Sequence, residues 1–153
     1  MDTRIADADR KELAGELGRL LGDTYATYLK THGYHWNVTG PMFHSLHVMF
    51  EEQYIEMWGA VDVIAERVRA LGYPAPGGAA ELAQLTSIPD EVGDADALQM
   101  VRRLLNAHEV VIQTARDVAG SAEAVGDIAT ADLATSRVEA HEKAAWMLRA
   151  TVD

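Results

Sequence analysis

Apolar side chains recur along most of the chain at steps of three and four residues, the spacing that places them on one face of a helix. The first segment with this pattern should end near Gly40 and Pro41, which interrupt it. A second helix is predicted from about Met42 to Leu71, because Gly72 follows it at once. The repeating face of the first helix carries Leu13, Leu17, Leu20, Thr24, Tyr28, Thr31 and His35.

Residues 73–94 are rich in Pro and Gly, which predicts a long connection in which the sequence AAELAQL can form a short helix. Two more long helices are predicted, from about Asp94 to Gly120 and from about Asp127 to Thr151. Their expected core stripes are Leu98, Val101, Leu105, His108, Ile112 and Ala115 in the first, and Ala134, Val138, His141, Ala145, Leu148 and Val152 in the second.

No segment alternates with the period of two that a half-buried strand needs, and no tandem repeat is visible. Four helices with one long middle connection predict an all-α, ferritin-like four-helix bundle. A length of 153 residues fits a single domain that spans residues 1–153.

The chain has no cysteine, which excludes disulfides and thiolate metal sites. Its formal net charge of −11 argues against nucleic-acid binding through bulk charge and favours cations as partners. The first residues lack the apolar core of a secretory signal, and no window approaches the roughly 20 apolar residues of a membrane span. We therefore expect a soluble, cytoplasmic protein.

The second predicted helix has two distinct faces. The core face carries Leu46, Phe50, Gln53, Met57, Val61, Ile64, Val68 and Leu71. A second stripe combines four potential metal ligands with two large apolar side chains, and its members are His47, Glu51, Ile55, Trp58, Asp62 and Glu66. A stripe with a Trp and an Ile between ionisable groups is more typical of a contact surface than of a solvated face.

Helix geometry limits how these ligands can meet. His47 and Glu51 lie one turn apart, as do Asp62 and Glu66, so each pair can converge on one ion. The two pairs lie roughly 16 Å apart along the helix axis at 1.5 Å per residue, too far to share an ion within one chain. A second copy packed antiparallel across a twofold axis near residues 56–57 would bring the acidic pair of one chain to the histidine pair of the other.

His35 lies just before the end of the first helix and can supply a further ligand. Two imidazoles and three carboxylates form a mixed nitrogen and oxygen set that suits Fe(II) and also accepts Zn, Mn or Co. The clustered histidines are thus interpreted as half of an iron site shared between two subunits.

The sequence HWNVTGPMFHSLHVMFEEQ, followed by VDVIAERVRALG, resembles the ferroxidase signature of the Dps family, the mini-ferritins named DNA-binding proteins from starved cells. The later segment GDIATADLATSRVEAHEKAAWML resembles the last helix of that family, so the similarity spans nearly the whole chain. The resemblance implies a hollow dodecamer that binds Fe(II), oxidises it with hydrogen peroxide in preference to oxygen, and stores the ferric product. The cage would thereby protect DNA and the cell from oxidative damage.

By the same resemblance, His35, His47 and Glu51 match ligands from one subunit, and Asp62 and Glu66 match those from its twofold mate. The family commonly has Asp where this chain has Glu51, so that carboxylate reaches one carbon further. Trp36 matches an aromatic residue beside the site. Asp127 and Asp132 match acidic residues of the threefold pores, although Asp127 can equally be a helix N-cap or first-turn acid.

Relatives that bind DNA directly carry a lysine-rich tail, whereas residues 1–13 hold Arg4, Arg10 and Lys11 against Asp2, Asp7, Asp9 and Glu12. Direct DNA binding is therefore expected to be weak or absent. The alternatives are a DNA-compacting protein with little ferroxidase activity, another di-iron oxidase on the same bundle, and a structural bundle without activity. The chain has no Glu-x-x-His motif of the kind that intrachain di-iron sites use.

The remaining histidines and several arginines have simpler interpretations. His108 and His141 fall on core stripes and are predicted to be hydrogen-bonded core residues. His32 is expected at the surface or an interface, and His44 can bind a second metal. The arginines expected to form ion pairs on an acidic surface are Arg67, Arg69, Arg102 and Arg103.

Overall fold

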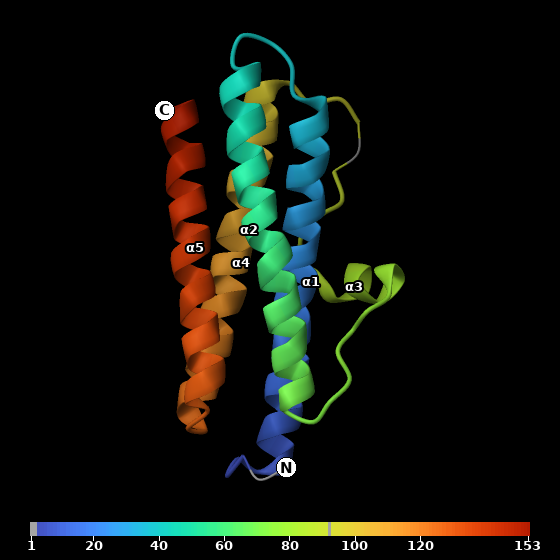
Figure 1. The fold of residues 1–153 in the computed structure, drawn as a ribbon, viewed down its shortest axis with the longest axis vertical. Coiled ribbons are helices and arrows are strands. Elements are labelled where there is room, and N and C mark those ends of the chain that lie inside the picture. Colours follow the sequence, from blue (N-terminus) through green and yellow to red (C-terminus); the bar gives the residue numbers. More distant parts are fainter. Residues whose placement is uncertain (1–2, 92) are drawn as a thin grey trace.

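The computed structural model describes residues 3–91 and 93–153, and within them the chain forms helices and no strand. Four long helices form a bundle and a short fifth one lies beside it (Figure 1). The all-α prediction and the short helix in the middle connection are confirmed. The helices are α1 (Asp7–Asn37), α2 (Phe43–Ala70), α3 (Ala79–Leu85), α4 (Ala97–Ala124) and α5 (Ile128–Val152).

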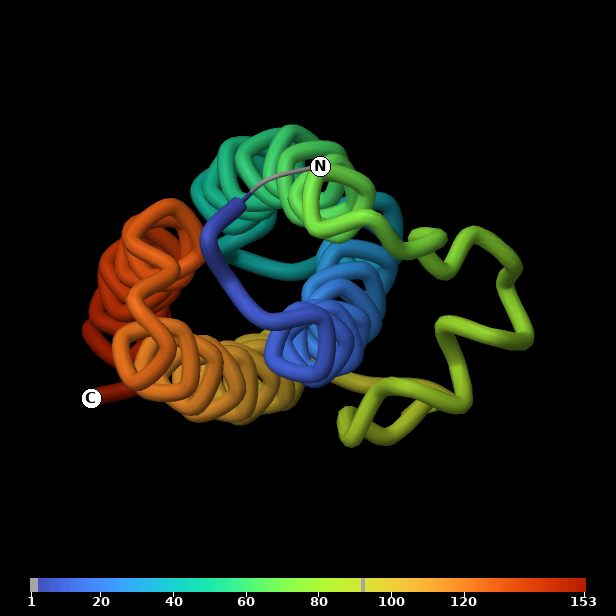
Figure 2. Tube along the Cα trace, turned by 90° about the horizontal axis from the view of Figure 1, so that it is seen from below, coloured from blue at the N-terminus to red at the C-terminus, as the bar shows by residue number. Residues whose placement is uncertain are grey.

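The order of the helices explains the long connection. α1 and α2 run antiparallel and are joined by a short turn at one end of the bundle, and α4 and α5 form a second antiparallel pair (Figure 1). α2 ends at the opposite end of the bundle from the start of α4, so the intervening chain must travel the bundle's length. It does so outside α1, where it carries α3 (Figure 2).

The core consists of two clusters of buried apolar side chains along the bundle axis. One includes Leu17 and Ile64, and the other includes Phe50 and Leu148. The predicted stripe of the third long helix was partly wrong, because Leu98 is 37% exposed. α4 packs against both α1 and α5, so its buried face is broad and also includes Leu104, Ala107 and Val111.

Residues 7–13 do not form a free tail. α1 already begins at Asp7, and Arg10 pairs with Asp7 at 2.8 Å and donates a hydrogen bond to the carbonyl of Leu71. Much of the charge that we assigned to a tail therefore lies on the first turns of a helix, while Asp2 lies outside the described residues. In the described part of the chain no helix is both long and apolar enough to cross a membrane.

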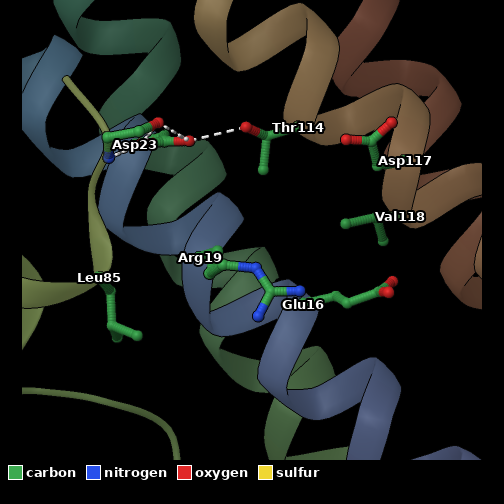
Figure 3. Close-up of a pocket in the computed structure, with 8 residues that line it drawn as sticks. Glu16, Arg19, Asp23, Leu85, Thr114, Asp117 and Val118 are labelled. Carbon is green, nitrogen blue, oxygen red and sulfur yellow. Dashed lines mark hydrogen bonds between the residues drawn. The ribbon is translucent and has the colours of Figure 1, made fainter.

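A buried carboxylate fastens the crossover to the bundle. Asp23 in α1 accepts hydrogen bonds from the Ser87 amide at 2.8 Å, the Thr86 hydroxyl at 2.8 Å and the Thr114 hydroxyl at 2.7 Å. Figure 3 shows the bond to Thr114 beside a small pocket whose wall also includes Asp117. Because the three donors come from the crossover and α4, this contact fixes the path of the connection relative to α1.

Candidate metal site on α1 and α2

The turn between α1 and α2 brings two histidines face to face. His35 lies in the last turn of α1 and is 8% exposed, and His47 lies near the start of α2. Their rings stack with centroids 3.8 Å apart and planes 13° apart. The structure therefore joins the two predicted imidazole ligands within one chain.

Reciprocal hydrogen bonds orient these two rings. Nδ1 of His35 donates to the carbonyl oxygen of His47 at 2.8 Å, and Nδ1 of His47 donates to the carbonyl oxygen of His35 at 2.7 Å. A carbonyl can only accept, so each neutral ring carries its proton on Nδ1 and leaves the Nε2 lone pair for a metal. Such contacts around ligating histidines fix both the tautomer and the ring orientation.

The three predicted carboxylate ligands lie along the exposed side of α2. Glu51, Asp62 and Glu66 are all exposed, and in residues 3–91 and 93–153 none of them makes a hydrogen bond or an ion pair. Between them lie Ile55, 57% exposed, and Trp58, 60% exposed. Unpaired carboxylates beside exposed apolar side chains are the features expected of a surface that a partner covers.

A single chain does not bring all of the predicted metal ligands together. Among the described residues, no group of three or more His, Asp or Glu side chains is close enough to hold a metal ion. His35 and His47 are together, whereas Asp62 and Glu66 lie further along α2. This separation follows from the rise of the helix.

Aromatic rings surround the two histidines, and the sequence interpretation missed several of them. Tyr54 packs edge-on against His35 with centroids 5.2 Å apart, and it stacks on His32 at 3.9 Å. Trp36 is 63% exposed and packs against His32 at 4.2 Å. Tyr54 follows His47 by seven residues, which is two helical turns. That spacing places both side chains on the same side of α2 and could have been read from the sequence. His32 thus lies in an intrachain aromatic cluster and is partly exposed, and the sequence interpretation did not predict its ring contacts.

The two acidic residues assigned to a pore have different surroundings. Asp127 is buried, caps the N-terminus of α5 through the Thr130 amide, and pairs with Arg67 at 2.8 Å, so the structure shows the capping alternative and not an exposed carboxylate of the kind a pore needs. Burial raises the pKa of the Asp127 carboxyl, but hydrogen bonds from Thr130 and Arg67 outweigh burial and hold that pKa below its ordinary value. Asp132 is exposed on α5.

The other histidine pair is a core feature, as predicted. His108 and His141 are each 1% exposed, and their Nδ1 atoms lie 2.8 Å apart. Arg137 donates to Nε2 of His141 at 3.0 Å and pairs with Glu56. Because Arg137 can only donate, neutral His141 carries its proton on Nδ1 and donates it to His108. Neutral His108 then accepts at Nδ1 and carries its own proton on Nε2, which is buried and has no hydrogen-bond partner among the described residues.

The bundle has the features of a ferritin-like fold. It consists of two antiparallel helix pairs joined by a crossover that carries a short helix, and one long helix has a face of histidine and carboxylate side chains. The model of the ferritin-like domain family matches residues 14–153. A low temperature-induced protein of Nostoc sp. is 39% identical over 151 residues, which cover 97% of this chain and 84% of that protein.

A DNA protection during starvation protein of Brevibacillus brevis is 36% identical over 140 residues, covering 90% of this chain and 92% of the relative. The chain therefore belongs to the ferritin-like family and, within it, to the Dps proteins. Among solved structures, the Dps protein of Vibrio cholerae O1 superimposes with a TM-score of 0.93 at 28% identity, covering 97% of this chain and 94% of that one. That protein is described as a member of a broad superfamily of ferritin-like diiron-carboxylate proteins.

Proposed function

We propose that this protein is a ferroxidase that binds Fe(II) between two subunits, oxidises it with hydrogen peroxide or oxygen, and stores the ferric product in a dodecameric cage. The observation that carries the proposal is the reciprocal bonding of His35 and His47, which leaves both Nε2 lone pairs for a metal. Iron is here the substrate and the cargo. Membership of the Dps proteins supports the same chemistry.

The second half of each site is proposed to come from a twofold-related copy. In an antiparallel contact centred near residues 56–57 of α2, the partner would bury Ile55 and Trp58, which are exposed in the single chain. Its Asp62 and Glu66 would then approach the first chain's histidines. Burial of such side chains contributes roughly 25 cal/mol per Å² of apolar surface removed from water, which favours the contact.

Each residue has a role that follows from its chemistry. His35 and His47 would donate neutral nitrogens, while Glu51, Asp62 and Glu66 would bring negative charge that stabilises Fe(III) more than Fe(II). Two Fe(II) ions give one electron each to a peroxide molecule, which takes up two protons and leaves as two waters. Trp36 would lie at the edge of the site, where an oxidant approaches.

Stopped-flow mixing of anaerobic, Fe(II)-loaded protein with hydrogen peroxide or with oxygen tests the proposal. Ferric absorbance should rise faster with peroxide in the native protein and be lost in a His35→Ala, His47→Ala variant. Ser45→Ala is the matched control, because Ser45 is an exposed polar residue of the same segment that we assign no metal-binding role. Oxidation no faster than that of Fe(II) in protein-free buffer would exclude ferroxidase activity.

Protection of DNA is proposed to be chemical, through removal of Fe(II) and peroxide together. Phosphate binding requires a basic surface, and a chain with a formal net charge of −11 does not favour it. A gel-shift assay at low salt, where phosphate-driven binding is strongest, should show free DNA. A retarded band under those conditions would instead favour the DNA-compacting alternative.

A further inference from the structure

A cavity of about 200 Å³ lies between α2 and α5, on a side of the bundle that the iron site does not use. These helices are neighbours (Figure 2), yet they contact each other less than the other neighbouring long helices do. The cavity reaches from exposed side chains at its mouth to His108 of α4, which is 1% exposed. This α2–α5 cleft therefore connects the surface with the polar centre of the bundle.

Two buried side chains in the wall of the α2–α5 cleft have unused hydrogen-bonding atoms. Gln53 is 8% exposed, and neither Oε1 nor Nε2 of its amide has a partner among the described residues. His108 accepts from His141 at Nδ1, and its Nε2–H group likewise has no partner in residues 3–91 and 93–153. Buried polar groups in folded proteins are nearly always hydrogen-bonded. The α2–α5 cleft thus presents two donor groups and one acceptor to the molecule that fills it.

These three atoms define the polar end of a ligand. Because Nε2 of His108 carries a proton, it requires an acceptor and does not bind a metal ion. A primary carboxamide matches the whole set. Its carbonyl oxygen has two lone pairs and can accept from both His108 and Gln53, while its NH₂ group can donate to Oε1 of Gln53.

The charges around the α2–α5 cleft favour a neutral ligand. Glu56 lines the cleft, but it forms an ion pair with Arg137. Glu52 and Lys143 are exposed at the mouth, and neither forms an ion pair within the described part of the chain. The two positive and two negative formal charges cancel, so the cleft attracts neither an anion nor a cation through net charge.

The rest of the wall is apolar. Ala140, Ala144 and Met147 of α5 contribute methyl groups and a thioether. Water held against such a wall lacks hydrogen-bond partners, and an apolar group that displaces it gains affinity. The sulfur of a methionine also contacts aromatic rings favourably. Pockets for drug-sized ligands measure roughly 300–1,000 Å³, so this smaller cavity fits a small molecule.

We propose that the α2–α5 cleft binds a small neutral molecule in which a primary carboxamide is attached to a flat apolar body. The amide would lie between Gln53 and His108, and the apolar body would lie against Met147. At about 100° per residue, Gln53 and Ile55 point about 160° apart around α2, so the cleft lies away from the proposed twofold contact. The proposal therefore does not depend on ferroxidase activity.

Saturation-transfer difference NMR tests the site in the assembled, iron-free protein with nicotinamide, which joins a primary carboxamide to an aromatic ring. The probe should receive saturation from the protein. Its Kd should be at least about tenfold lower than that of pyridine, which lacks the amide, or of nicotinate, which carries a carboxylate instead. This comparison uses the native chain and does not rely on any substitution.

Two variants locate the binding. Ala144→Leu places a larger side chain in the α2–α5 cleft and should abolish the nicotinamide signal. Gln53→Met keeps the length of the side chain without its amide and should raise the Kd at least about tenfold. Ala150→Leu is the matched control, because Ala150 is an exposed alanine of α5 outside the lining. Circular dichroism and size-exclusion chromatography establish that each variant keeps the native fold and assembly.

Four results would overturn the inference. Absence of nicotinamide binding would mean that the cleft holds only water. Pyridine binding as tight as that of nicotinamide would show that the unpaired atoms of Gln53 and His108 do not recognise the ligand. Tighter binding of nicotinate would indicate an anion site, and a signal that persists in a folded Ala144→Leu variant would place the binding elsewhere.

Discussion

Hydrogen-bond partners decide what each histidine of this protein can do. His35 and His47 donate from Nδ1 to carbonyl oxygens and keep Nε2 unprotonated, whereas His108 and His141 bond to each other. This is the arrangement that the proposed iron site requires of the first pair. The second pair instead links α4 to α5 inside the bundle and reaches Glu56 through Arg137.

The buried histidine pair predicts acid sensitivity. Burial, with help from the charge of Arg137, lowers the pKa of His108 to about 4, and burial likewise lowers the pKa of His141. An unfolded histidine, with a pKa of about 6.5, takes up a proton at a pH where the native one does not. Stability is therefore complete above pH 6.5 and falls as the pH drops toward 4, by about 1.4 kcal/mol per pH unit for each histidine.

Urea denaturation at several pH values between 7 and 4.5 measures this slope. A His108→Leu, His141→Leu variant should show a shallower loss of unfolding free energy with falling pH, whatever its stability at neutral pH. An equal slope in the variant and the native protein would show that other groups take up the protons.

Asp23 is predicted to be the most sensitive polar residue of the crossover contact. In Asp23→Asn the amide nitrogen replaces an oxygen that accepts from Thr86 and Ser87 or from Thr114, so at least one buried donor loses its acceptor. The unfolding free energy should fall by about 2–3 kcal/mol, as expected for a buried bond to a charged group. Asp117→Asn, an exposed residue of the same pocket, should change it by less than about 0.5 kcal/mol in the same denaturation experiment.

At the scale of elements, most helix ends were predictable from local chemistry, but the predicted end near Gly120 was wrong, because α4 continues through it to Ala124. Gly72 and Gly126 have positive φ, and Asp127 caps α5, so the residue types mark where helices stop and start. The buried face of α4 was predicted less well, because two neighbouring helices, rather than the helix's own periodicity, determine its width.

Part of the candidate site could also be predicted from the sequence, and part could not. His47, Glu51, Asp62 and Glu66 follow one face of α2, so helical spacing alone grouped them. The contacts of Tyr28 and Tyr54 with histidines depend on the register between α1 and α2, which periodicity within one helix does not contain. The hydrogen bonds of His35 and His47 depend on the same register.

The start of α5 is predicted to depend on Asp127 more than the start of α4 depends on Asp96. Both residues cap a helix through their side chains, but Asp96 is exposed, whereas Asp127 also pairs with Arg67 in a buried position. Asp96→Ala should lower the unfolding free energy by about 1 kcal/mol, the usual cost of losing a cap. Asp127→Ala should lower it by about 3 kcal/mol or more, because it also leaves a partly buried guanidinium unpaired. Equal losses in denaturant titrations would mean that the ion pair contributes little.

At the scale of the whole molecule, the exposed acidic residue of α5 is predicted to affect iron uptake. A ring of Asp132 carboxylates around a pore would raise the local concentration of cations, so Asp132→Asn should slow uptake at low ionic strength. The difference should shrink in high salt, which screens the field. Asp90→Asn, an exposed change in the crossover, is the control for the loss of one charge. Identical uptake rates for Asp132→Asn and the native protein in dilute buffer would remove Asp132 from the path.

The final prediction concerns how two chains share one site. One variant carries His35→Ala and His47→Ala, and a second carries Asp62→Ala and Glu66→Ala. Each alone should be nearly inactive, because every site lacks half of its ligands. In a mixed dimer one site lacks both halves, but the other combines the intact histidines of the second variant with the intact acids of the first.

Dissociating and reassembling the two variants together should therefore restore oxidation to about a quarter of the native rate, since half of randomly paired dimers are mixed and each has one complete site of two. Mass spectrometry can establish that mixed dimers form, and stopped-flow oxidation of Fe(II) measures the recovery. Native protein carried through the same dissociation serves as the reference for losses during reassembly. Mixed dimers that remain inactive would mean that the histidines and the acids do not meet across a twofold axis, because ligands held within one chain cannot complement each other between chains.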